Sequence, residues 1–384
     1  MSFLKFKPCV FVVDDEYEIL VVANKNAILA VEIAGEEYDE DNSGVLSSEK
    51  DYARIRVPQD VLNAEKSYTV VYREAIDRKG YFSEIGERQK ETFEFKPLTK
   101  TKDIHIYHIG DVHYGYDFAK LTANYFGDDT DLFIFNGDIG EVETVKNYHE
   151  TIEYVSEVTE GKIPAIFTRG NHDARGKLAE RYTDYFPSNG KKTYYTFSIG
   201  CLNGVVLDCG EDKKDDHYDK NYPMPWVYNG VNKFSKFRKK QAEWLKNLEL
   251  ENDGKITFAI SHICPVLTTK KHGSCFDIER ETYGEWAKEL ERLGIKFMVT
   301  AHKHHCFIAD KDFEFNTQPH TYPVIVGSRL YRERYVRREG DAHSRVVVDN
   351  FYGAAITVNP GKIEVKFTDQ NHDIYEDKVY TLEI

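Results

Sequence analysis

Between residues 103 and 310 the chain repeatedly places a short apolar segment directly before a cluster of polar residues. The segments are IHIYHIG, LFIFNGD, IPAIFTRG, ITFAISHIC and KFMVTAHKHH, with helical stretches such as 141–160 between them. Apolar runs that alternate with helices predict buried strands of an α/β domain. In such sheets ligands bind at the carboxyl ends of the strands, so we expect the five polar clusters to form one site.

Residues 1–98 have a different pattern. Short segments rich in β-branched and aromatic residues, such as EILVVA and SYTVVYREA, alternate with turn formers and charges such as EEYDEDNSG. This pattern predicts an all-β N-terminal domain, a small antiparallel sandwich. FKPLTKTKD, at 95–103, is interpreted as a linker. The expected domains are therefore a sandwich over 1–98 and an α/β domain over 103–384.

Charge and cysteine usage argue against several classes of protein. The chain has 65 acidic and 51 basic residues, a net charge of −14, which opposes loose binding to nucleic acids. No apolar run approaches the ~20 residues needed to span a bilayer, and no signal-peptide cleavage site follows the N-terminal apolar stretch. The six cysteines form no CxxC pair, which argues against structural zinc. We expect a cytoplasmic protein without a membrane segment that acts on a small substrate.

The polar clusters contain residue types that hold metal ions. The candidate ligands are Asp111, His113, Asp138, Asn171, His262, His302 and His304. GDVH and AHKH each place two of them two residues apart, and such positions face the same way on an extended backbone. In GNHD, Asn171 offers a carbonyl oxygen and His172 is expected to diverge toward the substrate. Each motif alone is weak, because a strand-end Asp commonly caps a helix or turn; five in order indicate a shared metal site.

These blocks together resemble the motif set of the calcineurin-like metallophosphoesterases, which runs GDxH, GDxxG, GNHD or GNHE, a His, and GHxH. In this chain the blocks are GDVH at 110–113, GDIG at 137–140, GNHD at 170–173, SH at 261–262 and AHKH at 301–304. The resemblance covers about residues 103–310 and implies a four-layer α/β/β/α fold. Ala301 stands where the family usually has Gly, which we expect to matter only if that backbone needs a positive φ.

The resemblance also implies roles. It implies that Asp111, His113 and His304 hold a first metal ion, that Asn171, His262 and His302 hold a second, and that Asp138 bridges them. Mn, Fe or Zn would suit these ligands. A hydroxide bridging the ions would attack the phosphorus of a phosphate mono- or diester. His172 would be the general acid, and Asp173 would orient it.

The two-domain plan is similar to that of the purple acid phosphatases, whose coloured ferric site uses a Tyr placed as GDxxY. This chain has Glu141 at that position, and it has His113 where those enzymes lack a His. We therefore predict a colourless centre without a tyrosinate ligand. An alternative for the whole chain is a catalytically decayed scaffold or binding protein on this fold, against which the complete ligand set argues.

Basic residues near the motifs have two interpretations. Arg169 and Arg175 flank GNHD and could contact a phosphate, although a surface position explains each as well. The segment 329–338 holds five arginines, which would suit anionic substrates or a solvated surface. In the helix FSKFRKKQAEWLKNLEL we expect KFRKKQ to face water, and we expect Phe237, Trp244 and Leu248 to pack inward.

Overall fold

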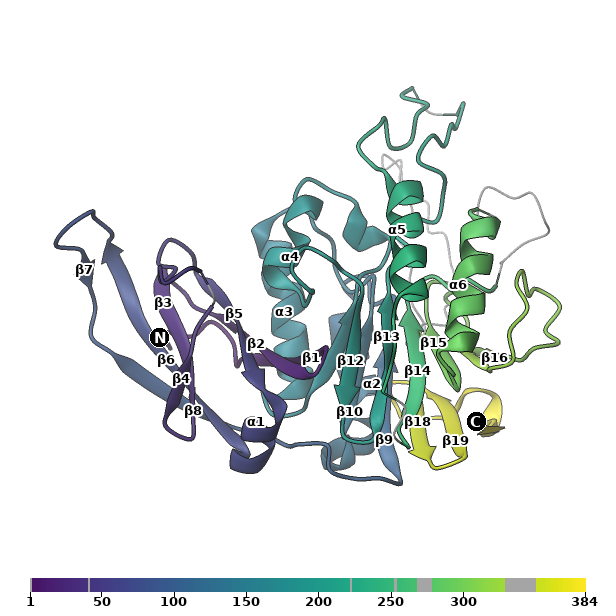
Figure 1. The fold of residues 1–384 in the computed structure, drawn as a ribbon, viewed down its shortest axis with the longest axis horizontal. Helices are drawn as coiled ribbons and strands as arrows, with labels where there is room; N and C mark the ends of the chain where they lie inside the picture. The colour runs from purple at the N-terminus through teal and green to yellow at the C-terminus, as the bar shows by residue number, and fades with distance from the viewer. Residues whose placement is uncertain (1, 41, 222, 252–253, 268–277, 329–349) are drawn as a thin grey trace.

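Two β-sheets lie face to face between two pairs of helices (Figure 1). The computed structural model describes residues 2–40, 42–221, 223–251, 254–267, 278–328 and 350–384. Its α-helices are α1 (Gln59–Glu65), α2 (Tyr116–Ala123), α3 (Val145–Thr159), α4 (Tyr182–Tyr185), α5 (Phe234–Lys246) and α6 (Arg280–Arg292). Short 3₁₀ helices lie at Asn124–Asp129, His172–Ala174, Ala179–Arg181 and Tyr375–Asp377. The predicted four-layer α/β/β/α arrangement is confirmed.

The larger sheet has nine strands in the order β20-β19-β18-β9-β10-β11-β1-β2-β5. They are β1 (Cys9–Val13), β2 (Glu16–Val22), β5 (Tyr52–Pro58), β9 (Ile104–Ile109), β10 (Leu132–Asn136), β11 (Ala165–Thr168), β18 (Gly353–Asn359), β19 (Lys362–Thr368) and β20 (Tyr380–Glu383). The strands β9, β10, β11 and β1 run parallel. Helices α2 and α3 cover the outer face of this sheet. Thr144 begins α3 with a capping box in which its side chain and that of Asn147 each accept from the other's backbone.

The smaller sheet has six strands in the order β12-β13-β14-β15-β17-β16. They are β12 (Tyr195–Ile199), β13 (Leu202–Leu207), β14 (Ile256–Ser261), β15 (Phe297–Thr300), β16 (Phe307–Ala309) and β17 (Val324–Val326). Successive residues point to opposite faces. Val206, Ile260, Val299 and Ile325 belong to the core between the sheets, whereas Val205, Ala259, Met298 and Val324 belong to the core beneath α5 and α6. This sheet therefore carries one apolar face for each neighbouring layer.

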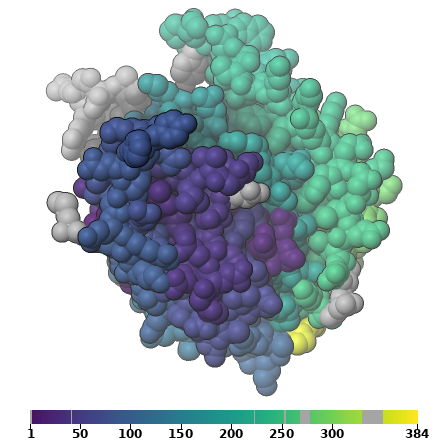
Figure 2. Space-filling view, turned by 60° about the vertical axis from the view of Figure 1, so that its left-hand side comes forward, coloured from purple at the N-terminus to yellow at the C-terminus, as the bar shows by residue number. Residues whose placement is uncertain are grey.

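Strand pairing crosses the predicted domain boundary at residue 98. The strands β3 (Ala27–Ile33), β4 (Glu36–Tyr38), β6 (Ser67–Asp77), β7 (Glu84–Ile85) and β8 (Gln89–Glu94) form a separate sheet. By contrast β1, β2 and β5 extend the nine-stranded sheet, with Phe11 of β1 beside Ala165 of β11. The N-terminal residues form one face that lies directly against the rest of the molecule (Figure 2). One sheet of the expected sandwich is thus continuous with the α/β part.

Local composition could not show this continuity. The β1 sequence CVFVV is buried along its whole length, a pattern that suits a sandwich core or a parallel sheet equally well. The expected linker at 95–103 is also partly packed, because Phe95 and Leu98 are buried. Within the described ranges, no helix is both long and apolar enough to cross a membrane.

Candidate metal centre

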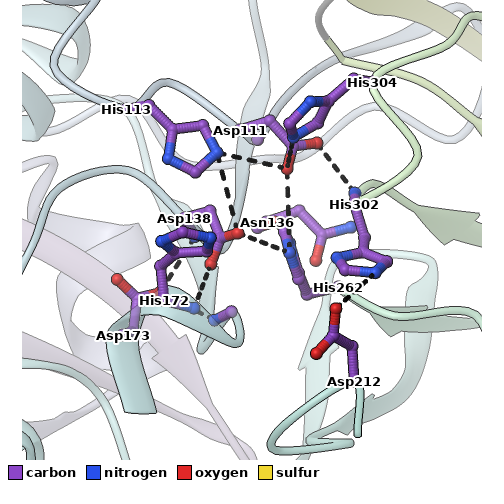
Figure 3. A network of polar contacts seen from close by, with 12 residues as sticks. Asp111, His113, Asn136, Asp138, His172, Asp173, Asp212, His262, His302 and His304 are labelled. Carbon is purple, nitrogen blue, oxygen red and sulfur yellow. Dashed lines mark hydrogen bonds and ion pairs between the residues drawn. The ribbon is translucent and has the colours of Figure 1, made fainter. Parts of the chain in front are cut away.

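The five polar clusters meet in one place between the two sheets (Figure 3). GDVH, GDIG and GNHD follow the carboxyl ends of β9, β10 and β11, and the remaining histidines follow β14 and β15. Backbone hydrogen bonds join neighbouring loops: Asp111 N donates to Gly137 O over 3.0 Å, and Ala301 N donates to His262 O over 3.0 Å. Parallel strands thus bring residues far apart in the sequence to one edge, as the sequence predicted.

The possible ligand atoms form three overlapping groups, two of which have no member in common. Asp111, His113 and His304 make one group, and Asp138, His262 and His302 make the other, with all ligand atoms of each group within 4.8 Å of one another. His304 Nε2 lies 3.2 Å from Asp111 Oδ1, and His262 Nε2 lies 3.2 Å from Asp138 Oδ2. His113 Nε2 links the groups, at 4.0 Å from Asp111 Oδ1 and 3.8 Å from Asp138 Oδ2. A third group, His113, Asp138 and His172, shares members with both, so the ligand atoms form one continuous cluster.

Two buried atoms in this cluster point to a cation. Asp111 Oδ1 and His113 Nε2 are buried and make no hydrogen bond of good geometry with a described residue. A buried polar atom without a partner destabilises a fold by about 1–3 kcal/mol, more when it is charged. A metal ion between these atoms would satisfy both, so the residues fit the metals that the motifs imply.

Asn171 can also serve as a metal ligand, provided that its side-chain amide oxygen faces the cluster. One end of its side-chain amide lies 3.2 Å from His262 Nε2, 3.3 Å from Asp138 Oδ2 and 2.9 Å from His302 Nδ1, and the other end lies 2.9 Å from Arg175 Nη2. Without a cation, hydrogen bonding favours the amide nitrogen toward the cluster and the oxygen toward Arg175. To bind a metal, Asn171 must turn its amide oxygen toward the cluster. The amide nitrogen then faces Arg175 Nη2, and both of these groups are hydrogen-bond donors. Metal binding by Asn171 is therefore incompatible with a hydrogen bond from Arg175 Nη2 to its amide oxygen.

The charges in the cluster are strongly coupled. Burial opposes ionisation of Asp138, yet the nearby His262, His172 and His113 hold the pKa of its carboxyl well below the usual range. Burial also opposes charge on His262, but Asp138 and Asp111 raise the pKa of this imidazole to about 10. Because a metal-bound histidine must be neutral, binding of a cation has to displace that proton.

Unusual backbone conformations place the ligand side chains. Asp111, His113, Asp138, His302 and His304 have φ of 49°, 42°, 53°, 66° and 54°. The expectation that strand alternation aims these pairs is therefore wrong, because the residues follow the strand ends in left-handed turns. Such conformations are unfavourable for non-glycine residues and cluster at functional sites. Ala301 is not among the residues with positive φ, so its replacement of the usual Gly introduces no backbone strain.

Comparison with known proteins agrees with this geometry. Residues 104–306, more than half of the chain, match the family model described as calcineurin-like phosphoesterase. The chain belongs to this family. It is accordingly a metal-dependent phosphoester hydrolase by family.

Solved structures match the chain at low sequence identity, and the first of them shows the same fold. A purple acid phosphatase from yellow lupin (Lupinus luteus) seeds matches with a TM-score of 0.62 and 10% identity, over 98% of this chain and 74% of the other. GAP50, the anchor in the inner membrane complex of Plasmodium, matches with a TM-score of 0.41 and 10% identity, over 73% and 89%. The phosphopantetheinyl hydrolase from Mycobacterium tuberculosis matches with a TM-score of 0.36 and 13% identity, over 60% and 92%. A search among curated proteins found no match.

Several groups hold the candidate ligands of this phosphoesterase in place. His262 Nδ1 lies 2.6 Å from Asn136 O, which leaves Nε2 facing the cluster. The Asp111 carboxylate accepts from His302 N over 2.8 Å. The ring of His302 has its Nε2 3.9 Å from Asp212 Oδ2. Such outer contacts fix the tautomer and orientation of metal-binding histidines. Neither Asn136 nor Asp212 lies in a family motif.

Asp173 has a different place from the one predicted. Its carboxylate accepts hydrogen bonds from the backbone of Gly170 over 2.7 Å and of Asp138 over 3.0 Å. It therefore ties the GDIG and GNHD loops together and does not orient the His172 ring through a hydrogen bond. Burial, with repulsion from Asp138, raises the pKa of this carboxyl to about 7.

Of the two arginines, only Arg175 reaches the site. Arg169 Nε lies 2.7 Å from Asp208 Oδ2, and both side chains are largely or wholly buried, so its predicted contact with phosphate is replaced by an internal ion pair. Arg175 Nη1 lies 3.1 Å from His172 Nε2, while Nε and Nη2 donate to the buried Glu211 carboxylate over 2.5 and 2.6 Å. The arginine-rich segment 329–338 lies outside the described residues.

The expectation that KFRKKQ of α5 faces water is partly wrong. Arg238, within KFRKKQ, is fully buried, as is Gln241, whereas Phe237, Trp244 and Leu248 are only partly buried. Arg238 Nε donates to Cys209 O over 2.8 Å, and Nη2 donates to Glu211 O. A charged side chain in the core thus fixes the loop that carries the carboxylate partner of Arg175.

We expect Arg238→Met to lower the free energy of unfolding by about 2–4 kcal/mol, because it leaves two buried carbonyls without donors. Chemical denaturation would measure this change. Lys239→Met is the matched control, since its exposed neighbouring side chain should change stability by less than about 0.5 kcal/mol. Equal stability of the two variants would show that the Arg238 hydrogen bonds contribute nothing.

Proposed function

We propose that this phosphoesterase uses a binuclear centre to hydrolyse a phosphate mono- or diester of a small substrate. The observation that carries the proposal is the pair of ligand groups, one with Asp111 and one with Asp138, that lie near each other around His113 Nε2. Asp111, His113 and His304 would hold one ion, and Asn171, His262 and His302 the other. Bound ions would activate the attacking water and neutralise charge on the phosphoryl oxygens. The presence of every candidate ligand argues against a decayed scaffold.

His172 is the proposed general acid. A guanidinium can only donate, so its contact with Arg175 makes Nε2 an acceptor and places the ring proton on Nδ1. Burial lowers the pKa of His172, and the charge of Arg175 acts in the same direction. The ring would have to carry a second proton to act, and this imidazolium would protonate the leaving oxygen from Nδ1.

The proposed role of His172 predicts an effect that depends on the leaving group. We expect His172→Gln to lower kcat for phenyl phosphate by roughly 10²–10⁴-fold, because phenolate leaves slowly without a proton. The loss for p-nitrophenyl phosphate should be much smaller, since p-nitrophenolate needs no acid. Steady-state kinetics on metal-loaded protein would give both values, with His372→Gln as a control in an exposed histidine. Equal losses for both substrates would exclude general-acid catalysis.

A colourless, non-tyrosinate centre is part of the same proposal. The position that the tyrosine has in GDxxY, three residues after Asp138, is occupied by Glu141, which cannot supply a tyrosinate ligand. Protein loaded with iron should therefore show no tyrosinate charge-transfer band in its visible spectrum. Comparing p-nitrophenyl phosphate with bis-p-nitrophenyl phosphate under Mn, Fe or Zn would separate monoester from diester activity and rank the metals.

A further inference from the structure

Part of the segment between β13 and α5 folds back on itself as a projecting hairpin, residues 214–221 and 223–231 (Figure 1). Tyr218 pairs with Trp226 in an antiparallel bridge, and their rings meet edge to face with centroids 5.0 Å apart. At the base of the hairpin, the Asp215 carboxylate accepts hydrogen bonds from two backbone amides in the first turn of α5. The hairpin is therefore an ordered element that is fixed to the start of the helix.

The hairpin exposes several large apolar side chains. They are Tyr218, Met224, Trp226, Val227 and Val231, of which Met224 and Val231 are 71% and 83% exposed. Apolar side chains gathered on one exposed element commonly mark a site of contact with a partner or a membrane. Tyr and Trp suit a membrane–water interface, because each has an apolar ring and a polar group. A projecting tip can insert into a lipid layer without a matching pocket, whereas a protein partner would need one.

Helix α5 adds a positively charged face next to the hairpin. Lys236, Lys239 and Lys240 are exposed, and among the described residues none of the three has an ion-pair partner. Glu243 is the one acidic residue of this helix. Residues three and four apart lie on the same side of an α-helix, so the three lysines occupy one face within about 6 Å of helix length. This face is available to a negatively charged partner.

The positive face of α5 contrasts with the acidic chain as a whole. The net charge of −14 would repel a negatively charged surface at long range. At physiological ionic strength, however, charges farther away than about 8 Å are largely screened, so the lysines nearest the surface decide whether contact is favourable. The neighbouring helix α6 exposes Glu281 and Glu285 but also Lys288 and Arg292, so it does not cancel the positive face.

The type of positive residue favours lipid over protein as the partner. Protein–protein interfaces are enriched in Arg and depleted in Lys. The exposed positive residues of α5 are lysines, and its one arginine, Arg238, is buried. Exposed lysines beside aromatic and aliphatic side chains are typical of proteins that bind the surface of an anionic membrane. Such binding is peripheral and needs no membrane-spanning helix.

We propose that the hairpin and the exposed face of α5 bind the surface of an anionic lipid membrane. The lysines of α5 contact the headgroups, and Met224, Trp226 and Val231 of the hairpin enter the interface. The inference goes beyond the proposed function and does not depend on it. Because β13 runs parallel to β14 and β15, the hairpin rises from the edge of the sheet that carries the candidate metal centre. Membrane binding would therefore hold that centre near the lipid surface.

Flotation with lipid vesicles tests the lysine face. The wild-type protein should bind vesicles of phosphatidylcholine and phosphatidylserine, and should not bind vesicles of phosphatidylcholine alone. A Lys236→Gln, Lys240→Gln double variant should bind the anionic vesicles about tenfold more weakly or worse, because each lysine near such a surface strengthens binding about fivefold. Lys102→Gln, Lys362→Gln is the matched control, since it removes the same charge from exposed positions at the opposite edge of the sheet. Equal binding by the two double variants would overturn the proposal.

The apolar contribution is tested without any change of charge. A Met224→Ser, Trp226→Ser double variant should also bind the anionic vesicles about tenfold more weakly or worse, because binding scales with the apolar area that enters the interface. Tyr81→Ser, Phe82→Ser changes two side chains that are more exposed, in another part of the chain, and should bind like the wild type. Circular dichroism would verify that each variant is folded. Wild-type binding by the folded Met224→Ser, Trp226→Ser protein would exclude insertion of the hairpin.

A titration with poly-L-glutamate separates a lipid surface from an acidic protein partner. If the wild type binds this polymer through Lys236 and Lys240 but does not float with anionic vesicles, the surface recognises acidic protein and the lipid proposal is wrong. Failure to bind the anionic vesicles even at low salt also overturns it. Flotation needs neither bound metal nor turnover, so its result is independent of whether the protein hydrolyses phosphate esters.

Discussion

Asp138→Asn is expected to lower kcat/KM for p-nitrophenyl phosphate by at least about a thousandfold, which corresponds to several kcal/mol of transition-state stabilisation. Asp138 belongs to one ligand group and also approaches the other: its Oδ2 is 3.2 Å from His262 Nε2 in its own group and 3.8 Å from His113 Nε2 in the other. Its Oδ1 accepts from His172 N over 2.7 Å. The variant keeps the size of the side chain and removes the charge, so the number of metal ions per chain should fall as well.

Metal content and activity should be measured on the same preparation. Elemental analysis after dialysis would count the ions, and Asp128→Asn, which changes an exposed aspartate, is the matched control. Full metal content with full activity in Asp138→Asn would contradict a bridging role. Full activity after complete removal of metal from the wild type would contradict the binuclear proposal itself.

Gly170→Ala is expected to reduce activity by roughly a hundredfold or more without unfolding the protein. A Cβ at this position would overlap Oδ1 and the backbone nitrogen of Asp138, and no flexible side chain is there to yield. The two loops touch so closely that a Cβ at Gly137 would also lie 2.5 Å from Gly170 Cα. The proposed bridging carboxylate must therefore move, and displacements of ~1 Å can lower catalysis by about 10².

The same glycine variant should also bind metal more weakly, which metal titration would measure. Gly80→Ala is its control, because a Cβ there meets no atom within 4 Å and the backbone φ is not positive. Circular dichroism would show whether the variant keeps the fold. If the Gly170→Ala protein is folded and has wild-type metal affinity and activity, the close approach of the GDIG and GNHD loops is not needed for function.

The sequence predicted the candidate site better than it predicted the groups around it. The ligand types recur at strand ends, and parallel strands bring such ends together whatever the details of packing. Arg238 could not be found this way, since an arginine among lysines on a helix has the pattern of a solvated face. Its burial depends on the carbonyls of Cys209 and Glu211, which come from another part of the chain.

The prediction for Asp173 was wrong in its contacts for a similar reason. Its neighbour in sequence is His172, but its hydrogen-bond partners are the backbone amides of Gly170 and Asp138. The position of the second amide depends on how β10 and β11 pair, and nothing in the GNHD motif encodes that pairing. Asp212 likewise meets His302 only after β13 and β15 have taken their places in the smaller sheet.

The pairing of β1 with β11 has a consequence for synthesis of the chain. Phe11 leaves the ribosome about 150 residues before its partner Ala165. During that interval the wholly apolar strand CVFVV has only its antiparallel neighbour β2 on one side, and its other edge is open. Contacts this distant in sequence form slowly, and open apolar edges associate with other chains. This edge of β1 therefore stays open until the strand leading to GNHD emerges.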